Sequence, residues 1–280
     1  MRRDLPKYSR IARTQHDVDA AQRLRFRSLA GELKIGIASD PRVGREISSF
    51  DNLETTHHLL LYCDLSLIGT ARLALPNREV ASANGTLLGF ELEQEFALTG
   101  LFSIREGLAE VARVCILESW RSTTAVLRLY EGLYCLSREL GVTHWIGGVD
   151  CQTSRRDDAE LMHSALADRE LVDPRIEVFA RPHAHIVPGP SAATSVFHSG
   201  FYSDGERASA GGRLSELRLA STLLTFTRRL GARCIGHPAR HPAFPRFVMP
   251  MLVALDQIPQ PTLAKFDLSL LAPSLERRAS

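Results

Sequence analysis

The sequence is short of cysteine, of long apolar runs and of net charge. Its five cysteines never stand in a Cys-x-x-Cys spacing, which fits a reducing cytosol better than a disulfide framework. No apolar run approaches the roughly 18–20 residues that span a bilayer, and no apolar segment follows the basic N-terminus as in a secretory signal. A net charge of +2 over 280 residues leaves no strong electrostatic footprint for nucleic acid. We therefore expect a cytoplasmic protein that does not bind nucleic acid.

Several catalytic signatures are also absent. There is no Gly-x-Ser-x-Gly elbow, no Walker loop and no Gly-x-Gly-x-x-Gly turn, so hydrolase, NTPase and dinucleotide oxidoreductase functions lose most of their support. The ten histidines include His57-His58 and His183-x-His185, but no His-Glu-x-x-His occurs. From these patterns we expect no metal site.

What is present is an ordinary globular composition, with 44% hydrophobic and 24% charged residues, enough for a sizeable core. Apolar β-prone runs alternate with segments of helical periodicity, and from Leu108 onward strand, helix, strand and helix indicate a parallel crossover. The predicted strands are Tyr8–Ala12, His58–Cys63, Leu67–Leu75, Leu108–Leu117, Thr143–Val149, Ile176–Ile186, Cys234–His237 and Phe247–Leu255. The predicted helical segments are Thr14–Leu33, Glu91–Phe96, Ser122–Leu140, Arg156–Leu166 and Leu214–Leu230.

Two charged residues stand inside the most apolar of these strands. A carboxylate at Glu110 and a guanidinium at Arg113 are costly to bury unless they are paired. Positions three apart on a strand point to opposite faces, so the two side chains share a face only across a β-bulge, and bulges are frequent beside active sites. Glu110 is therefore a candidate general base, with a structural ion pair at a strand end as the equal alternative.

Other arginines are candidate ligands for anionic groups. Arg72 lies in an otherwise apolar strand and can bind a carboxylate or phosphate through two hydrogen bonds, unless it faces solvent at a sheet edge. Arg23, Arg25 and Arg27 follow one another on the first helix, where a solvated helix face is the default interpretation.

Two further positions are ambiguous on local evidence. Asp51 follows Phe50 after a Gly/Pro loop, where a turn or capping role competes with chemistry. Arg121 and Ser122 open the helix after the central strand, and a helix N-terminus is a natural phosphate site, but the loop before it has no glycine.

Together these motifs resemble the GNAT-fold N-acyltransferases, a group that includes ornithine-lipid N-acyltransferases, long-chain N-acyl amino acid synthases and acyl-homoserine-lactone synthases. The resemblance covers roughly residues 8–166, and residues 217–256 resemble the ornithine-lipid type more loosely. The segments that carry it are Ala21–Arg27, Phe50-Asp51, His58–Leu60, Gly69–Leu73, Glu110–Val114, Trp120-Arg121, Leu133-Tyr134 and Trp145–Gly148.

The resemblance implies a GNAT-like α/β fold: a mixed central sheet flanked by helices and completed by a C-terminal helix and strand pair. We expect one acyltransferase domain over residues 1–258, with residues 187–213 as a loop insertion and 259–280 as a tail. It also implies the site residues. The family's Glu-x-x-Arg falls on Glu110 and Arg113, its sheet arginine on Arg72, its first-helix arginine on Arg23 or Arg25, and its Phe-Asp on Asp51. The oxyanion-binding backbone falls at Val114, Cys115 and Ile116, and Arg121 stands at the helix start.

The implied reaction is transfer of a fatty-acyl group from a thioester to the amine of an amino acid or a related small amine. Departures from the family bear on the donor. The acetyltransferase pyrophosphate loop is missing after the central strand, where the sequence from Arg121 reads Arg-Ser-Thr-Thr-Ala, and this favours an acyl carrier protein over coenzyme A. We expect no tightly bound cofactor, only the acyl-thioester as co-substrate.

Two alternatives stay open: an acyl-homoserine-lactone synthase-like enzyme, and a non-catalytic module that binds acyl groups or the carrier protein. The first ranks below amino-acid acylation because His57 stands where an acid often precedes the His-Leu pair. A lipid product would bring peripheral membrane contact.

Overall fold

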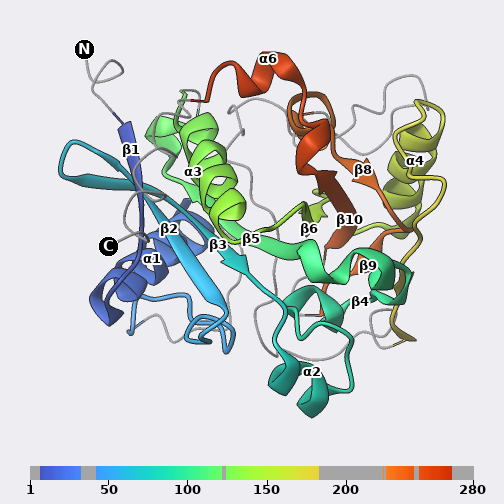
Figure 1. Ribbon diagram of the computed structural model, residues 1–280, viewed down its shortest axis with the longest axis horizontal. Coiled ribbons are helices and arrows are strands. Elements are labelled where there is room, and N and C mark those ends of the chain that lie inside the picture. Colours follow the sequence, from blue (N-terminus) through green and yellow to red (C-terminus); the bar gives the residue numbers. More distant parts are fainter. Residues whose placement is uncertain are drawn as a thin grey trace, which may run out of the picture.

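The computed structural model describes residues 7–32, 42–121, 124–182, 223, 225–242 and 246–266. These residues build an eight-stranded sheet in the order β1-β2-β3-β5-β6-β10-β8, with β9 pairing beside β8 on β10, and a separate pair β4-β7 (Figure 1). The strands of the large sheet are β1 (Lys7–Ile11), β2 (Thr56–Cys63), β3 (Ser66–Ala74), β5 (Leu108–Ile116), β6 (His144–Asp150), β8 (Arg233–Cys234), β9 (Ala239–Arg240) and β10 (Phe247–Ala254). The small pair consists of β4 (Phe96–Ala97) and β7 (Phe179–Ala180).

The N-terminal half follows the sequence closely. Helix α1 (Gln15–Phe26) begins with a capping box, in which the Thr14 hydroxyl accepts from the Asp17 N–H and the Asp17 carboxylate accepts from the Thr14 N–H. It ends before the predicted Leu33, and the wider π-helical turn η1 (Arg27–Glu32) follows. The predicted hairpin is confirmed, because β2 and β3 pair antiparallel around a turn in which Asp64 has φ 53°.

The two faces of the sheet carry different helices. Helix α3 (Ala125–Glu139) buries its apolar stripe on one face, where it joins the largest apolar cluster. Helix α1 contacts the same strands from the other face, and α4 (Arg156–Ala167) lies at the far end of the molecule (Figure 1). Short elements complete the α1 face: α2 (Arg78–Asn84), η2 (Glu91–Gln94) and η3 (Thr99–Gly107).

The predicted crossover is confirmed, since β5 and β6 are parallel with α3 between them in the chain. The remaining neighbours of these strands are antiparallel, so the sheet is mixed, and β10 with β8 extends it beyond β6 as expected for the C-terminal strand pair. After β10 come η8 (Leu255–Gln257) and α6 (Gln260–Leu263). The predicted tail therefore begins inside the fold: Phe266 is buried and its ring lies 5.8 Å from that of Tyr134 on α3.

Two sequence expectations fail or fall outside the description. Of the predicted strand Ile176–Ile186, the structure describes residues 176–182, and among these only β7 forms ladder pairs, with β4. Residues 187–213 and most of the predicted helix Leu214–Leu230 lie outside the described residues; of that helix the structure describes Leu223, Thr225 and η7 (Phe226–Leu230).

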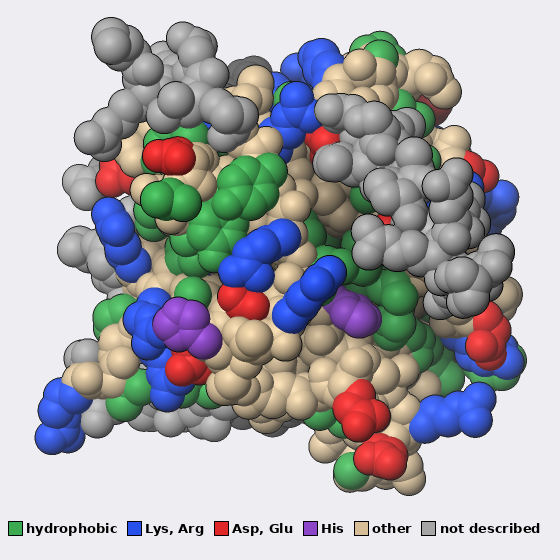
Figure 2. Space-filling view, turned by 60° about the vertical axis from the view of Figure 1, so that its left-hand side comes forward, with side chains coloured by type: hydrophobic (Ala, Val, Ile, Leu, Met, Phe, Trp, Pro, Cys, Tyr) green, Lys and Arg blue, Asp and Glu red, His purple; other side chains and the backbone are tan. Residues whose placement is uncertain are grey.

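The described helices and the face drawn in Figure 2 bear on membrane contact and on surface charge. No described helix is long and apolar enough to cross a bilayer. On the face drawn in Figure 2, basic and acidic side chains are interspersed, which agrees with the small net charge of the sequence.

Candidate active site

The central strand β5 contains a β-bulge at Arg113. Thr70 of β3 pairs with Cys115 of β5, and Arg72 pairs with Ala112. One residue separates the two positions on β3 and two residues separate them on β5, so β5 has one extra residue. Arg113 takes up the extra residue with φ 54°, in the left-handed region that costs a non-glycine residue on the order of 1 kcal/mol or more. The bulge that would let Glu110 and Arg113 share a face is therefore present.

The bulge decides which side chains share a face. The residues of β5 in the α3-side cluster are Ala109, Val111, Val114 and Ile116, with one interval of three instead of two. Glu110 and Arg113 thus both point to the opposite face, where α1 packs. A regular strand would have put one of them into the apolar core under α3.

Beside the bulge, β5 and β6 separate. Their parallel ladder contains only Leu108↔His144, Ala109↔Trp145 and Glu110↔Ile146, although both strands continue, β5 as far as Ile116. After Glu110, the edge of β5 that faces β6 therefore has no ladder pairs with β6 among the described residues.

The N–H of Ile116 points toward that edge. The Leu117 N–H donates to the Ile68 carbonyl on β3, and alternate N–H groups of a strand point to opposite edges. The Arg121 guanidinium is at the same edge, because its Nε donates to the Ile116 carbonyl at 3.0 Å.

On the α1 face of β3 and β5, three guanidinium groups and three carboxylates alternate in a closed ring. Each arginine contacts two carboxylates and each carboxylate contacts two arginines, so the charges balance within the ring. All six side chains are at most 3% exposed. In order, the members are Arg25, Asp51, Arg72, Glu91, Arg113 and Glu46, and Glu46 closes back on Arg25.

Asp51 is the best-connected carboxylate of the ring. Its Oδ2 lies 2.5 Å from Arg25 and accepts from the Gln22 side-chain amide and the Ser48 N–H, and its Oδ1 lies 3.3 Å from Arg72. Burial alone would raise its pKa, but the charges of Arg25 and Arg72 outweigh burial and hold the pKa below its ordinary value. Asp51 is therefore ionised and fixed.

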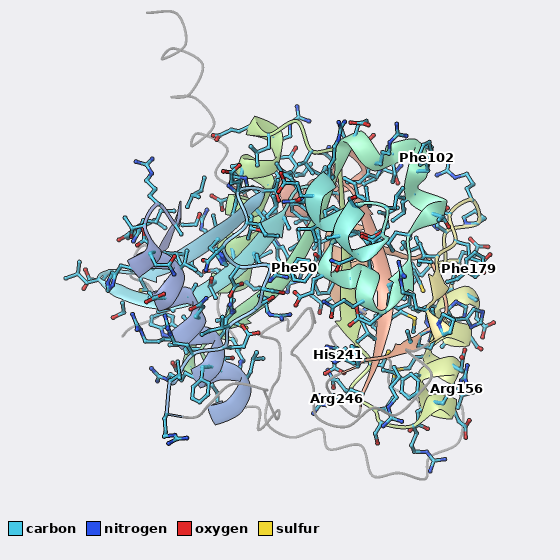
Figure 3. All side chains as sticks on the ribbon, turned by 90° about the horizontal axis from the view of Figure 1, so that it is seen from below. Phe50, Phe102, Arg156, Phe179, His241 and Arg246 are labelled. Atoms are coloured by element: carbon cyan, nitrogen blue, oxygen red, sulfur yellow. The ribbon has the colours of Figure 1, made fainter. Side chains whose placement is uncertain are left out.

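Glu91 and Glu46 complete the ring around Arg113. Arg113 lies 3.0 Å from each, and Glu91 also contacts Arg72 while Glu46 lies 2.5 Å from Arg25. Burial raises the pKa of Glu46, and the neighbouring Arg113 and Arg25 more than compensate, so the net shift is downward. In Figure 3, Phe50 lies between α1 and the segment that holds η2 and η3. The Arg72 guanidinium is 5.9 Å from the centre of the Phe50 aromatic ring.

Glu110 stands outside this ring and is held by backbone. Its side chain is 0% exposed, and its two oxygens accept from the N–H groups of Glu91 and Leu92 at 2.9 and 3.0 Å. Its two contacts fix the start of η2 and with it Glu91. The general-base role expected of Glu110 stays a prediction.

The remaining predicted residues separate into three groups. Arg23 and Arg27 are exposed and outside the ring, so Arg25 is the first-helix arginine that belongs to the ring. Val114, Cys115 and Ile116 are buried on the bulged strand, and burial raises the pKa of the Cys115 thiol to about 12. Arg121 is buried and turned back, with NH2 donating to the Ser28 hydroxyl at 3.1 Å.

Sequence reasoning missed Glu46, Glu91 and Glu95. Glu46 lies in a stretch predicted as a loop and Glu91 at the start of the predicted helical segment Glu91–Phe96, and neither segment carries a pattern that marks a buried acid. Glu95 is 0% exposed, with neither oxygen hydrogen-bonded among the described residues, and His241 Nε2 is 3.8 Å away. Burial, reinforced by Glu91 and Glu110, raises its pKa well above the ordinary value, so it favours the neutral form.

Comparisons with known proteins find similarity over part of the chain. Residues 24–131 match the model of the acetyltransferase (GNAT) domain. An L-ornithine N(alpha)-acyltransferase of Rhizobium meliloti (strain 1021) is 30% identical over 149 residues, which are 50% of this chain and 48% of the relative. One of Agrobacterium fabrum (strain C58) is 28% identical over 177 residues, 58% of each chain. The chain thus spans about half the length of these curated relatives.

Among solved structures, FeeM, an N-acyl amino acid synthase from uncultured soil microbes, matches with a TM-score of 0.50 and 14% identity, covering 90% of this chain and 93% of that one. At that identity the match bears on the fold alone. The described residues therefore have a GNAT-like fold, as the sequence motifs predicted.

Proposed function

We propose that this chain, in which a GNAT-like fold carries a bulged and splayed central strand, is an N-acyltransferase. It moves a fatty-acyl group from a thioester to the amine of an amino acid or a related small amine. The observation that carries the proposal is the early end of the β5–β6 ladder beside the Arg113 bulge, because a free strand edge is where an extended thioester can lie.

The reaction needs an oxyanion donor and a fixed carbonyl. The amine nitrogen attacks the thioester carbon, a C–N bond forms and the C–S bond breaks; the amine loses a proton and the departing thiolate gains one. The N–H of Ile116, at the open edge, supports the negative oxygen of the intermediate, an effect of roughly 3–4 kcal/mol for one well-placed donor. Val114 and Cys115 belong to the same stretch of backbone.

Glu110, Arg113 and Arg72 serve this reaction as positioning residues. Arg113 sits at the bulge and Glu110 at the last residue of the ladder, so the ring contacts hold the strand in the shape that exposes its edge. Glu110 lies beside the charge-balanced ring and adds one carboxylate to it. The surplus of one carboxylate over the guanidinium groups favours an ammonium substrate nearby over an anionic one.

For the donor we propose an acyl carrier protein. A coenzyme A diphosphate would need basic or amide donors at the start of α3, and Arg121 is engaged with Ile116 and Ser28 instead. The names of the two curated relatives make L-ornithine the first acceptor to test.

A small apolar pocket between α3 and η7, with a cavity volume of only about 10 Å³, is lined by Val126, Leu127, Tyr130, Phe226 and Leu230, and the acyl chain would enter here if the pocket opens. Substituting Val126→Phe should shift the preference toward shorter acyl chains. A chain-length profile unchanged from wild type would remove the pocket from the proposal.

The deciding experiment measures free thiol release from acyl-carrier protein, and in parallel from acyl-CoA, with a panel of amines that begins with ornithine. Mass spectrometry identifies the amide product. We expect amine-dependent thiol release, faster with the carrier protein. Saturable binding of the acylated carrier without amide formation would instead identify a non-catalytic binding module.

The role of Glu110 is tested by Glu110→Gln. The amide group would face two backbone N–H groups with one acceptor fewer, so the expected result is a lower Tm with a turnover loss that low temperature partly restores. A Tm equal to wild type with turnover abolished would instead return Glu110 to the role of general base.

A further inference from the structure

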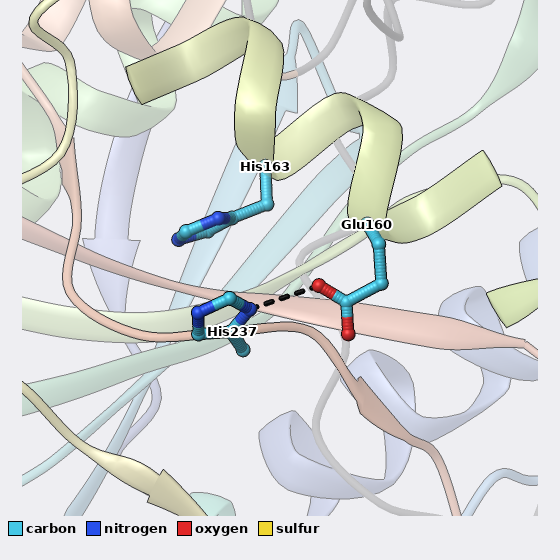
Figure 4. Close-up of side chains that lie close together, drawn as sticks. All are labelled: Glu160, His163 and His237. Carbon is cyan, nitrogen blue, oxygen red and sulfur yellow. Dashed lines mark hydrogen bonds and ion pairs between the residues drawn. The ribbon is translucent and has the colours of Figure 1, made fainter. Parts of the chain in front are cut away.

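Away from the proposed active site, three side chains with metal-binding atoms converge between α4 and the connection from β8 to β9. They are Glu160 and His163 of α4 and His237 of the connection, and one ligand atom of each lies within 4.8 Å of the others (Figure 4). Among the described residues this group combines two imidazoles with one carboxylate. Helix α4 lies on the side of the molecule opposite α1 in both Figure 1 and Figure 3.

The fold brings these residues together for identifiable reasons. Glu160 and His163 stand three apart on α4 and therefore share one helix face. His237 is 77 positions from Glu160, and its Nδ1 is 2.8 Å from the Glu160 Oε2. The His163 and His237 rings stack with centroids 4.1 Å apart. Two imidazoles and a carboxylate are thus held close together on one surface.

We propose that Glu160, His163 and His237 bind a divalent transition-metal ion of the zinc class, with solvent completing the coordination. Two imidazole nitrogens favour zinc, cobalt, nickel or copper, whereas magnesium and calcium require mostly oxygen ligands. Metal–ligand bonds of about 2.0–2.1 Å place tetrahedral ligand atoms about 3.3 Å apart, so the group has to contract by no more than about 1.5 Å.

Side-chain rotation is enough for that contraction. The His237 side chain is 63% exposed and the Glu160 side chain 34%, so neither is locked by packing. One nearby cation opposes the ion: Arg156 Nε lies 3.7 Å from the Glu160 Oε1, and the Arg156 side chain is 59% exposed and free to turn outward. The bound ion would clamp α4 to the β8–β9 connection and stabilise that end of the sheet.

The test uses the full chain after treatment with a chelator, in the background His183→Ala/His185→Ala, which removes the His-x-His pair of the sequence. Zinc binding is followed by calorimetry, and cobalt by its visible absorption, which reports tetrahedral coordination. We expect one zinc equivalent with a Kd at or below the micromolar range, a rise in Tm with zinc, and neither signal with magnesium.

Four variants separate the site from the surface around it. His163→Ala and His237→Ala should weaken zinc binding at least tenfold, and Glu160→Gln, which can keep the hydrogen bond to His237, should do the same through loss of charge. Arg156→Ala should tighten binding severalfold. His16→Ala, at an exposed position of α1, is the matched control and should leave it unchanged.

Each variant's metal-free Tm is measured first, so that a loss of binding is not confused with a loss of folding. Millimolar affinity in wild type, or equal affinity in wild type and in His163→Ala and His237→Ala, would overturn the proposal and leave the three side chains as a surface hydrogen bond and ring stack.

Discussion

Two buried acids only four positions apart differ in how they carry charge. Glu91 balances Arg72 and Arg113, whereas Glu95 has no arginine contact among its described ion pairs and faces the charges of Glu91 and Glu110. Buried charge is tolerated where it is paired, and a lone buried acid keeps its proton.

The matched substitutions Glu91→Gln and Glu95→Gln should therefore behave oppositely. Glu91→Gln leaves two buried guanidinium groups undercompensated and should lower the free energy of unfolding by about 3–5 kcal/mol. Glu95→Gln replaces a neutral acid by a neutral amide. Because the folded pKa of Glu95 is raised, its contribution to stability is present below the unfolded value of 4.5 and is lost as the pH rises. The variant should gain on wild type as the pH increases; urea denaturation at pH 5 and pH 8 checks both signs.

His58 makes folding sensitive to acid. It is 2% exposed and its Nε2 lies 2.9 Å from the Asp51 carbonyl; burial and then Arg25 lower its pKa to about 4. The unfolded chain takes up a proton below about 6.5, whereas the folded chain resists until about 4, so stability falls as the pH drops through this window.

The contribution of His58 should reach about 3 kcal/mol at the acid end of that window. His58→Gln keeps a donor for the Asp51 carbonyl and removes the titration, so its stability should vary less between pH 7 and pH 5 than that of wild type. His16→Gln is the exposed control. Identical pH dependence in wild type and His58→Gln would contradict the assignment.

At the scale of elements, α3 packs unusually close to the N-terminal strands. A Cβ on Gly132 would lie 2.4 Å from the Ser9 hydroxyl of β1 and 2.8 Å from a methyl carbon of Leu59 on β2. Glycine therefore sets the distance between this helix and the sheet, and with it the position of the pocket that α3 lines.

Gly132→Val should lower the free energy of unfolding by about 2–3 kcal/mol through overpacking. Arg138→Val introduces the same β-branched residue at an exposed position of α3 and measures the helix-propensity cost alone, which is about 0.5 kcal/mol. Guanidinium denaturation compares the two. Because valine has a better helix propensity than glycine, a loss in Gly132→Val comes from the contact with Ser9 and Leu59, and a stability equal to wild type would contradict overpacking.

At the scale of the whole molecule, the charged ring joins parts of the chain that are distant in sequence. Its members come from α1, the segment before β2, β3, η2 and β5. Breaking one contact is thus expected to loosen the packing of several elements on the α1 face together.

Arg25→Lys and Arg23→Lys test this from neighbouring positions of one helix. Lysine cannot reproduce the forked contacts of Arg25 with Asp51 and Glu46, so we expect a loss of about 2–4 kcal/mol. Arg23 is exposed, and its substitution should change stability by less than about 0.5 kcal/mol. Comparable losses of unfolding free energy in both variants would show that the ring contacts of Arg25 add no stability beyond that of an exposed arginine.

The sequence by itself determined the main strands and helices between Lys7 and Ala167, though not α2, β4 or η3, because hydrophobic periodicity and capping signals such as Thr14–Asp17 are local. The spacing of Glu110 and Arg113 also required either a bulge or opposite faces. That the bulge exists, that Arg25 and not Arg23 faces inward, and that Glu110 is held by backbone amides were decided only by tertiary structure. The same holds for the approach of His237 to α4. These outcomes depend on which distant carboxylate or amide satisfies a buried charge, and no local pattern in the chain encodes that pairing.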